Sequence, residues 1–381
     1  MLRFKSTFAL FVAASLLLCG TTFAQEEKAA KGAKEKIHAL YIPLADHYPA
    51  IVAHHKYASK MKHADYSVEM MKSWPALSGK FLSGQADIAF IIAPLAMNMF
   101  AKTPNFKWVS LVHRDGSALA VNDIFVKNLG LAKNRADRAP TPAFANAAAK
   151  WAANMSRPSI SGVPSLQSTH TVVLYKYLKD HGKTLAIGSG PGDVLAKAVA
   201  PPKSAIFIQN LGKNGIAASF EQSLPWADIV EADGYGKVVW YSKDVIKWPK
   251  GHVECIIIAS DKAIKTKFLA LQEVIKSVHQ AGVDIQDAMS TGGAPLDKIA
   301  NTINGHYVKL HSVKAIKASL NKELGVINYV NLNNDVSGLQ MIMNLAVESG
   351  VMKAPIDLNQ FADERFATKL TVRDVKPVVN E

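Results

Sequence analysis

The sequence predicts an α/β protein of two lobes with a hinge between them, each lobe a mixed sheet flanked by helices. An apolar strand at 37–42 is followed by a helix at 49–61 in the first part of the chain. A new strand at 159–163, followed by a helix at 169–180, repeats this order further on. Alternating strands and helices favour largely parallel sheets with helices on their faces.

The remaining elements are expected from local patterns along the chain. Runs that are continuously apolar or alternate in polarity indicate strands, and periodic apolar segments that begin near Pro or Ser indicate helices. Strands are expected at 66–70, 88–92, 108–113, 118–121, 216–220, 238–241 and 252–259, and helices at 74–82, after Pro94, and at 143–154, 201–211 and 225–231. Residues 265–368 are mostly helical in pattern.

Residues 1–24 have the pattern of a signal peptide. Arg3 and Lys5 precede an apolar run that is too short to cross a bilayer comfortably, and small residues allow cleavage after Ala24. The alternative is lipid attachment at Cys19, which Leu18 disfavours because a small residue is expected before a lipidated cysteine. No later run is long and apolar enough to cross a membrane, so we expect an exported, soluble protein.

Composition also indicates the domain boundaries. Residues 25–36 are charged and rich in Ala and Gly, which is typical of a flexible leader. Residues 127–158 are rich in Ala, Asn, Arg and Pro and indicate a crossover between lobes. We therefore expect lobe 1 at 37–125 and 252–381, and lobe 2 at 126–251 with the crossover segments. A ligand bound between them would favour the closed state.

The charge balance restricts the class of partner. The chain has 44 Lys and Arg against 31 Asp and Glu, a formal charge of +13. Export disfavours nucleic acid, and no block of five basic residues marks a nucleic-acid arm. Two explanations remain open, long-range attraction of anions and a generally basic exported proteome. Cys255 is the single cysteine after Ala24, so no internal disulfide is expected.

Four loops at the starts of helices carry the candidate binding residues, because open α/β sheets bind ligands at strand ends. At the fourth loop, residues 167–170, the free backbone N–H groups at the helix start, the hydroxyl groups and His170 favour binding of a small oxyanion. The alternative is that Ser168 is only the N-cap of its helix. The candidates are Asp46, His47 and Tyr48; Trp74 and Pro75; Ala93 and Pro94; and Gln167, Ser168, Thr169 and His170.

These motifs resemble the solute-binding proteins of bacterial ABC importers in the nitrate, bicarbonate, sulfonate and taurine group. In that family a Trp within a Ser-Trp-x-Ala-Leu-like segment walls the pocket, and Trp74 matches it. The family also carries a Thr-His pair at the start of the second lobe's first helix, where the His contacts the ligand, and residues 169–170 match this pair. The segments 43–46 and 93–94 are similar to the family's Pro-Leu-Thr-Asp and Ala-Pro.

The resemblance covers most of residues 37–260 and, more loosely, 339–366. It implies the type II periplasmic-binding fold, a periplasmic location, a small-molecule ligand of anionic character and a permease in the inner membrane. It also implies a monomer without enzymatic activity, cofactor, metal or nucleic acid.

The sequence departs from the family at two places. The family often has Glu-Pro-Trp before a second-lobe helix, whereas this chain has Leu224 before Pro225 and Trp226. Glu221 is the nearest substitute for the missing Glu, but its carboxylate would lie in a different position. This difference puts a calcium-assisted bicarbonate site in doubt and favours a carboxylate-free pocket for an anion. The segment 113–117 replaces a neutral loop and contains the candidate Ser117. Its Arg114 either clamps an oxyanion or pairs with Asp115 on the surface.

Other motifs carry weaker alternatives. A metal site is one alternative, because four histidines lie close together in the sequence, but no Cys pair or His-x3-His accompanies them. These histidines are His47, His54, His55 and His63. The glycine-rich segment 188–193 lacks the Gly-Lys-Ser/Thr ending of a phosphate loop. Cys255 lies in an apolar run and is expected to be a buried structural thiol.

The resulting hypothesis is capture of a small oxyanion or organic sulfonate between two lobes for an ABC importer. A second hypothesis keeps the class and changes the ligand to a pyrimidine-type thiamine precursor held by Tyr48, Trp74 and Trp226. A third makes the protein the ligand-sensing partner of a sensor kinase. A fourth is an exported enzyme on the same scaffold, because fold does not fix function.

Overall fold

The computed structural model describes residues 33–307 and 310–370. The predicted signal peptide at 1–24, the lipidation alternative at Cys19 and most of the predicted leader lie outside the described residues. Within the described residues, no helix combines the length and the apolar character that crossing a membrane requires.

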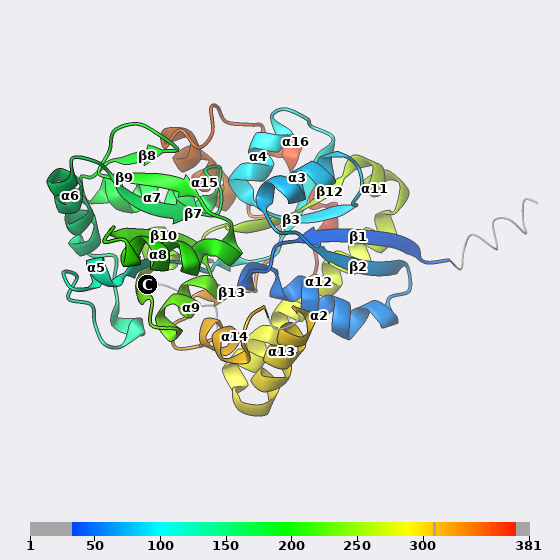
Figure 1. The fold of residues 1–381 in the computed structure, drawn as a ribbon. Helices are drawn as coiled ribbons and strands as arrows, with labels where there is room; N and C mark the ends of the chain where they lie inside the picture. Colours follow the sequence, from blue (N-terminus) through cyan, green and yellow to red (C-terminus); the bar gives the residue numbers. More distant parts are fainter. Residues whose placement is uncertain (1–32, 308–309, 371–381) are drawn as a thin grey trace, which may run out of the picture.

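The first sheet contains five strands. Strand β1 is parallel to β2 and β3, and β12 is antiparallel to β3 and β4. Its order is β2 (Ala64–Met70), β1 (Glu35–Tyr41), β3 (Ile88–Ile92), β12 (Cys255–Ser260) and β4 (Phe106–Leu111). All residues of β3 are buried, as its continuous apolar run predicts. The sheet therefore joins the N-terminal part of the chain to a strand that returns much later in the sequence (Figure 1).

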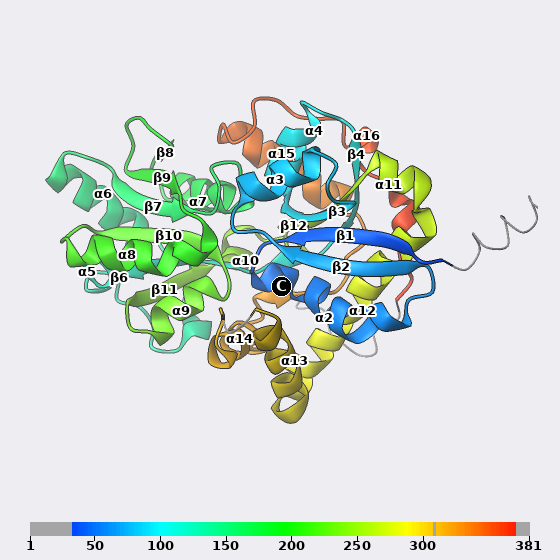
Figure 2. The ribbon, with the colours of Figure 1, turned by 45° about the vertical axis from the view of Figure 1, so that its right-hand side comes forward.

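The second sheet contains six strands and lies beside the first in both views (Figures 1 and 2). Strand β6 is antiparallel to β10 and β11, whereas β7 is parallel to β10 and β9, and β8 is parallel to β9. Its order is β11 (Gly236–Tyr241), β6 (Ser117–Asn122), β10 (Ala218–Ser223), β7 (Ser159–Val163), β9 (Val194–Ala198) and β8 (Leu185–Ile187). The predicted mixed sheets are confirmed.

One strand lies on the other side of the expected division. The sequence placed 118–121 with the first lobe, whereas β6 hydrogen-bonds to β10 and β11 in the second sheet. The apolar sequence of β6 would suit a buried strand in either sheet. Which sheet it joins depends on its partner strands, and a local sequence pattern does not identify them. The lobe boundaries at 125 and 252 otherwise stay a prediction.

Helices cover both sheets, and most begin within a few residues of the expected positions. The helices that precede β12 in the chain are α2 (Tyr48–Tyr57), α3 (Trp74–Leu82), α4 (Ala93–Phe100), α5 (Asp123–Val126), α6 (Ala143–Met155), α7 (Thr169–Asp180), α8 (Ser204–Lys213), α9 (Trp226–Ala232) and α10 (Ser242–Val245). The predicted helical C-terminal part is confirmed in α11 (Asp261–Thr266), α12 (Phe268–Thr291), α13 (Gly293–His306), α14 (Val313–Ser319), α15 (Val336–Glu348) and α16 (Leu358–Phe361). Helix α15 packs against both α4 and α7, and α14 packs against α9, so this part of the chain touches both halves.

Two segments cross between the sheets and pair with each other. Strand β5 (Arg114–Asp115) pairs with β13 (Ile327–Asn328) and makes an isolated bridge to Val253. The Asp115 N–H donates to the His252 carbonyl oxygen at 3.0 Å, and the His252 N–H donates to Asp115 Oδ1 at 2.8 Å. These bonds hold the crossing segments 112–116 and 251–254 together at the boundary between the halves.

Candidate functional site

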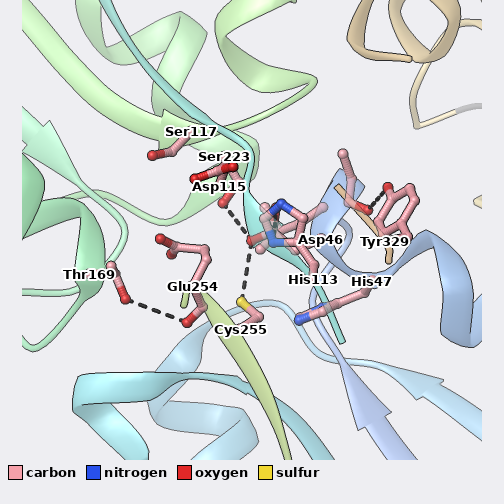
Figure 3. A network of polar contacts seen from close by, with 12 residues as sticks. Asp46, His47, His113, Asp115, Ser117, Thr169, Ser223, Glu254, Cys255 and Tyr329 are labelled. Carbon is pink, nitrogen blue, oxygen red and sulfur yellow. Dashed lines mark hydrogen bonds and ion pairs between the residues drawn. The ribbon is translucent and has the colours of Figure 1, made fainter. Parts of the chain in front are cut away.

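Buried polar side chains gather where the two sheets and the two crossing segments meet (Figure 3). We call this group the central cluster. Its members have no exposed surface, and they are Asp46, His113, Ser117, His170, Glu221, Ser223, Glu254 and Cys255. Buried polar side chains are normally paired, so such a concentration is a candidate binding site.

Asp46 enters the cluster from η1 (Ala45–His47), the short helix that follows β1. Its Oδ2 accepts hydrogen bonds from Ser223 Oγ at 2.8 Å and from Cys255 Sγ at 3.2 Å (Figure 3). Next to it, the Ala45 N–H donates to the Leu224 carbonyl oxygen at 2.7 Å. The loop after β1 is thereby joined to the end of β10 in the second sheet.

His170 enters from the first turn of α7. Ser168 is the N-cap of this helix, because its Oγ accepts from the Thr171 N–H at 3.1 Å. His170 Nε2 lies 2.8 Å from Ser223 Oγ, and its Nδ1 lies 3.2 Å from Glu254 Oε1. Thr169 Oγ1 lies 3.5 Å from the Glu254 carbonyl oxygen. The start of α7 therefore faces the segment that leads into β12.

Ser117 and Glu221 meet on neighbouring strands of the second sheet. Ser117 Oγ donates to Glu221 Oε1 at 2.6 Å. Both were predicted site residues, and the structure brings them together at the start of β6 and within β10.

Many polar atoms of the cluster lack a hydrogen-bond partner although they are buried. They are Asp46 Oδ1, both ring nitrogens of His113, His170 Nδ1, Glu221 Oε2, and Glu254 Oε1 and Oε2. An unpartnered buried polar group costs about 1–3 kcal/mol. Hydrogen bonds to a bound ligand would offset this cost, so these unpartnered atoms indicate where a ligand would bind.

Burial also shifts the acid–base equilibria of the cluster. It raises the pKa of Asp46 to about 7, and it raises the pKa values of Glu221 and Glu254 well above the usual range of a carboxyl group. The same cause lowers the pKa of His170 to about 3 and that of His113 well below its usual value. Burial thus favours the uncharged forms of these side chains.

The first-half candidates border the cluster to different degrees. Trp74 is buried and packs edge-on against His47, with 6.0 Å between ring centroids. The Ala93 N–H donates to the Glu254 carbonyl oxygen at 3.1 Å, and Pro94 is buried in the first turn of α4. Pro75 is exposed, so the structure does not bring it to the cluster.

Three other candidates form their hydrogen bonds with groups outside the cluster. Trp226 Nε1 donates to the Pro43 carbonyl oxygen at 3.1 Å, and its ring lies 4.8 Å from that of His311. Tyr48 OH also lies 3.5 Å from His311 Nδ1, so these two aromatic residues share a group that does not include Trp74. Gln167 is half-buried before the α7 cap.

Several members of the cluster were not predicted as site residues, namely His113, Ser223, Glu254 and Cys255. A carboxylate inside the apolar run 252–259 was the one available signal for Glu254. The cluster contains the carboxyl groups of Asp46, Glu221 and Glu254, so it differs from the expected carboxylate-free pocket. The expected pairing of Arg114 with Asp115 on the surface is wrong. Arg114 is buried and donates to Asp335 Oδ2 at 2.9 Å and to backbone oxygens.

The nearby histidines of the sequence do not form one group. His55 Nε2 lies 2.8 Å from His306 Nδ1 on α13, whereas His47 accompanies Asp46. Among residues 33–307 and 310–370, the one set of three or more His, Cys, Asp or Glu with mutually close ligand atoms is Asp46, Glu254 and Cys255. Their ligand atoms all lie within 4.8 Å of one another.

Comparison with solved structures shows the same fold in binding proteins. The periplasmic nitrate-binding protein NrtA of Synechocystis PCC 6803 matches with a TM-score of 0.70 and 16% identity, over 87% of this chain and 87% of its own. A zinc-bound ligand-binding component of an ABC-type import system from Staphylococcus aureus matches with 0.65 and 19%, over 87% and 98%. The aliphatic sulphonate-binding protein SsuA of Escherichia coli matches with 0.59 and 12%, over 92% and 98%.

The predicted periplasmic-binding fold is thus confirmed. No curated protein sequence matches the chain. The sequence model of the NMT1-like family matches residues 30–291, which is more than half of the chain. The chain belongs to the NMT1-like family.

Proposed function

We propose that this protein is the extracytoplasmic solute-binding component of an ABC importer and that it captures a small molecule at the central cluster. The observation that carries the proposal is the concentration of unpartnered buried atoms where both halves meet. The fold supports it, because the neighbours with this fold are binding proteins. The partner is a permease of the inner membrane, to which a monomer in its closed form presents both halves.

The donors of the cluster favour a ligand with oxyanion oxygens. Neutral His113 carries one ring N–H and one ring acceptor, neither of which has a partner. The hydroxyl groups of Ser117 and Ser223 donate to Glu221 and Asp46 without ligand and would turn to a ligand oxygen on binding. The carboxyl groups of Asp46 and Glu254 favour a ligand that also donates hydrogen bonds. Within the oxyanion and organic sulfonate class, these groups support a taurine-like aminosulfonate over nitrate, which has no donor.

A second ligand class has one observation in its favour. Neither oxygen of Glu254 has a hydrogen-bond partner, and an uncharged carboxyl group can donate one hydrogen bond to the edge of an aminopyrimidine and accept another from it. The aromatic cage expected for this ligand is not assembled, because Tyr48 and Trp226 lie with His311 and not with Trp74.

Titration calorimetry on the exported full chain in chelator-treated buffer tests the proposal. The ligands are taurine, an alkanesulfonate, nitrate, nitrite, bicarbonate and an aminopyrimidine. We expect taurine to bind and His170→Gln and Ser117→Ala each to weaken binding by about tenfold, the equivalent of one hydrogen bond of about 1.4 kcal/mol.

The matched control is His279→Gln, which changes a buried histidine between α12 and β4 and should keep the wild-type affinity. Binding of none of these ligands would overturn the proposed function. Binding that is unchanged in both cluster variants would overturn the proposed site.

A further inference from the structure

We propose that Asp46, Glu254 and Cys255 form a site for a divalent transition metal ion of the zinc class, and that His170 becomes the fourth ligand when its ring moves towards them, since it lies outside the set of ligand atoms within 4.8 Å of one another. The proposal goes beyond capture of an organic solute, although it uses the same cluster. The ion would be held by one carboxylate from each of Asp46 and Glu254, the Cys255 thiolate and an imidazole nitrogen.

The ligand atoms are already close to the spacing that a tetrahedral ion requires. Bond lengths of about 2.0–2.3 Å to nitrogen, oxygen and sulfur place neighbouring ligand atoms about 3.3–3.8 Å apart. Cys255 Sγ lies 3.2 Å from Asp46 Oδ2, and the ligand atoms of Asp46, Glu254 and Cys255 lie within 4.8 Å of one another. Side-chain shifts of about 1 Å would therefore close the three ligands around an ion.

The hydrogen bonds of Ser223 leave one nitrogen of His170 free to bind it. Ser223 Oγ donates its proton to Asp46 Oδ2, so at 2.8 Å from His170 Nε2 it accepts a hydrogen bond from that nitrogen. In the neutral ring Nδ1 then carries a lone pair, and this atom lies 3.2 Å from Glu254 Oε1 without a hydrogen-bond partner. This contact is satisfied in one of two ways, either by a proton on the Glu254 carboxyl that is donated to Nδ1 or by a metal cation that binds both atoms in place of that proton.

Glu254 supplies the independent reason to expect a cation. The side chain has no exposed surface, and neither of its oxygens has a hydrogen-bond partner. Asp46 Oδ1 is buried and unpartnered as well. In the described part of the chain, the basic side chains nearest to these carboxyl groups are His113, 3.9 Å from Asp46 Oδ1, and His170, and no lysine or arginine forms an ion pair with either group. An ion with two positive charges would satisfy these carboxylates together.

The donor set selects the class of ion. Calcium and magnesium prefer oxygen ligands, whereas a thiolate and an imidazole beside carboxylates suit zinc, cobalt(II) and iron(II). The ligands come from the loop after β1, the segment entering β12 and the start of α7. A bound ion would therefore tie the first half to the second and favour the closed state.

Cobalt(II) titration of the chelator-treated full chain tests the inference. We expect a thiolate-to-cobalt charge-transfer band in the near ultraviolet that saturates at a single ion per chain, is displaced by zinc, and is unaffected by calcium. Cys255→Ser should abolish the band, and Glu254→Gln should weaken cobalt binding by at least about tenfold. Ser223→Ala, which removes only a positioning residue, should weaken it by about 10–100-fold with the band retained.

Two matched controls isolate the cluster. His279→Gln changes a buried histidine elsewhere, and His306→Ala removes the partner of His55 on the surface. Both should keep the band and the affinity. A wild-type protein without the band, a band that survives Cys255→Ser, or displacement of cobalt by calcium would each overturn the inference.

The test separates this inference from the proposed function. If an organic solute binds in chelator-treated buffer and no band forms with cobalt, the metal site is wrong and solute capture stands. If cobalt and zinc bind and no organic solute does, with or without the ion, the proposed solute class is wrong and the metal site stands.

Discussion

At the residue scale, His113 owes its place to a glycine. Gly116 has φ of +87°, and an ideal Cβ on it would lie 2.0 Å from His113 Nε2. Any other residue at this position would meet the ring and would also adopt a left-handed backbone conformation that L residues disfavour. The His113 ring therefore occupies space that is free because residue 116 has no side chain.

Gly116→Ala is accordingly expected to lower the free energy of unfolding by about 2–4 kcal/mol, the sum of backbone strain and overpacking. Urea denaturation measures the change. The control is Gly79→Ala in α3, where nothing lies within 4 Å of the added Cβ and alanine should raise stability by about 0.5–1 kcal/mol. Equal denaturation midpoints for the two variants would contradict the assigned contact.

A second residue-scale prediction concerns acid stability. Burial lowers the pKa of His279 to about 4 from the usual 6.5, so the folded state favours the neutral ring. Its stabilising contribution is full above pH 6.5 and is lost as the pH falls through 6.5 towards 4. Between pH 7 and pH 5 the wild type should lose about 1–2 kcal/mol more stability than His279→Gln. Parallel curves of unfolding free energy against pH would show that the ring does not titrate in this way.

At the element scale, the starts of helices and the crossing segments position the cluster. The α7 N-terminus carries His170, the end of β10 carries Ser223, and the segment entering β12 carries Glu254. Ser168 was predicted as a ligand residue, but its hydroxyl is engaged in capping α7. Its contribution should therefore be to the helix.

Ser168→Ala should lower the unfolding free energy by about 1 kcal/mol, whereas Ser168→Asp, which can also cap, should restore it. Solute affinity should change by less than about twofold in both, as expected for a group whose role is helix capping. Chemical denaturation and calorimetry on the same preparations provide the two readouts. A large loss of affinity without a loss of stability would assign Ser168 to the ligand instead.

Local pattern predicted the elements well because it reports burial and helix boundaries directly. The apolar run 88–92 and the caps before α3 and α7 are contained in a few neighbouring residues. Sheet membership of β6 was not predictable in this way, since its partners β10 and β11 lie about a hundred residues further on. His113 and Glu254 were missed for the same reason, because each becomes a site residue only when two crossing segments meet.

At the scale of the whole molecule, the halves are joined through buried bonds beside the cluster. The Ala45 N–H donates to the Leu224 carbonyl oxygen, and Trp226 Nε1 donates to the Pro43 carbonyl oxygen. The C-terminal helices add contacts to both halves through α14 and α15. If the two halves open to admit a ligand as proposed, these bonds would have to break, and they would then favour the closed form.

Trp226→Phe should shift the balance between closed and open forms towards the open form, because it removes one buried hydrogen bond and keeps an aromatic ring. The loss of about 1 kcal/mol corresponds to a roughly fivefold change in the ratio of open to closed molecules. Small-angle X-ray scattering should then give a larger radius of gyration without ligand, and saturating ligand should restore the wild-type value. Trp151→Phe on α6, away from the boundary, is the control. Identical scattering from the two variants would mean that the bond to Pro43 does not hold the halves together, and Trp226 would then contribute only packing with His311.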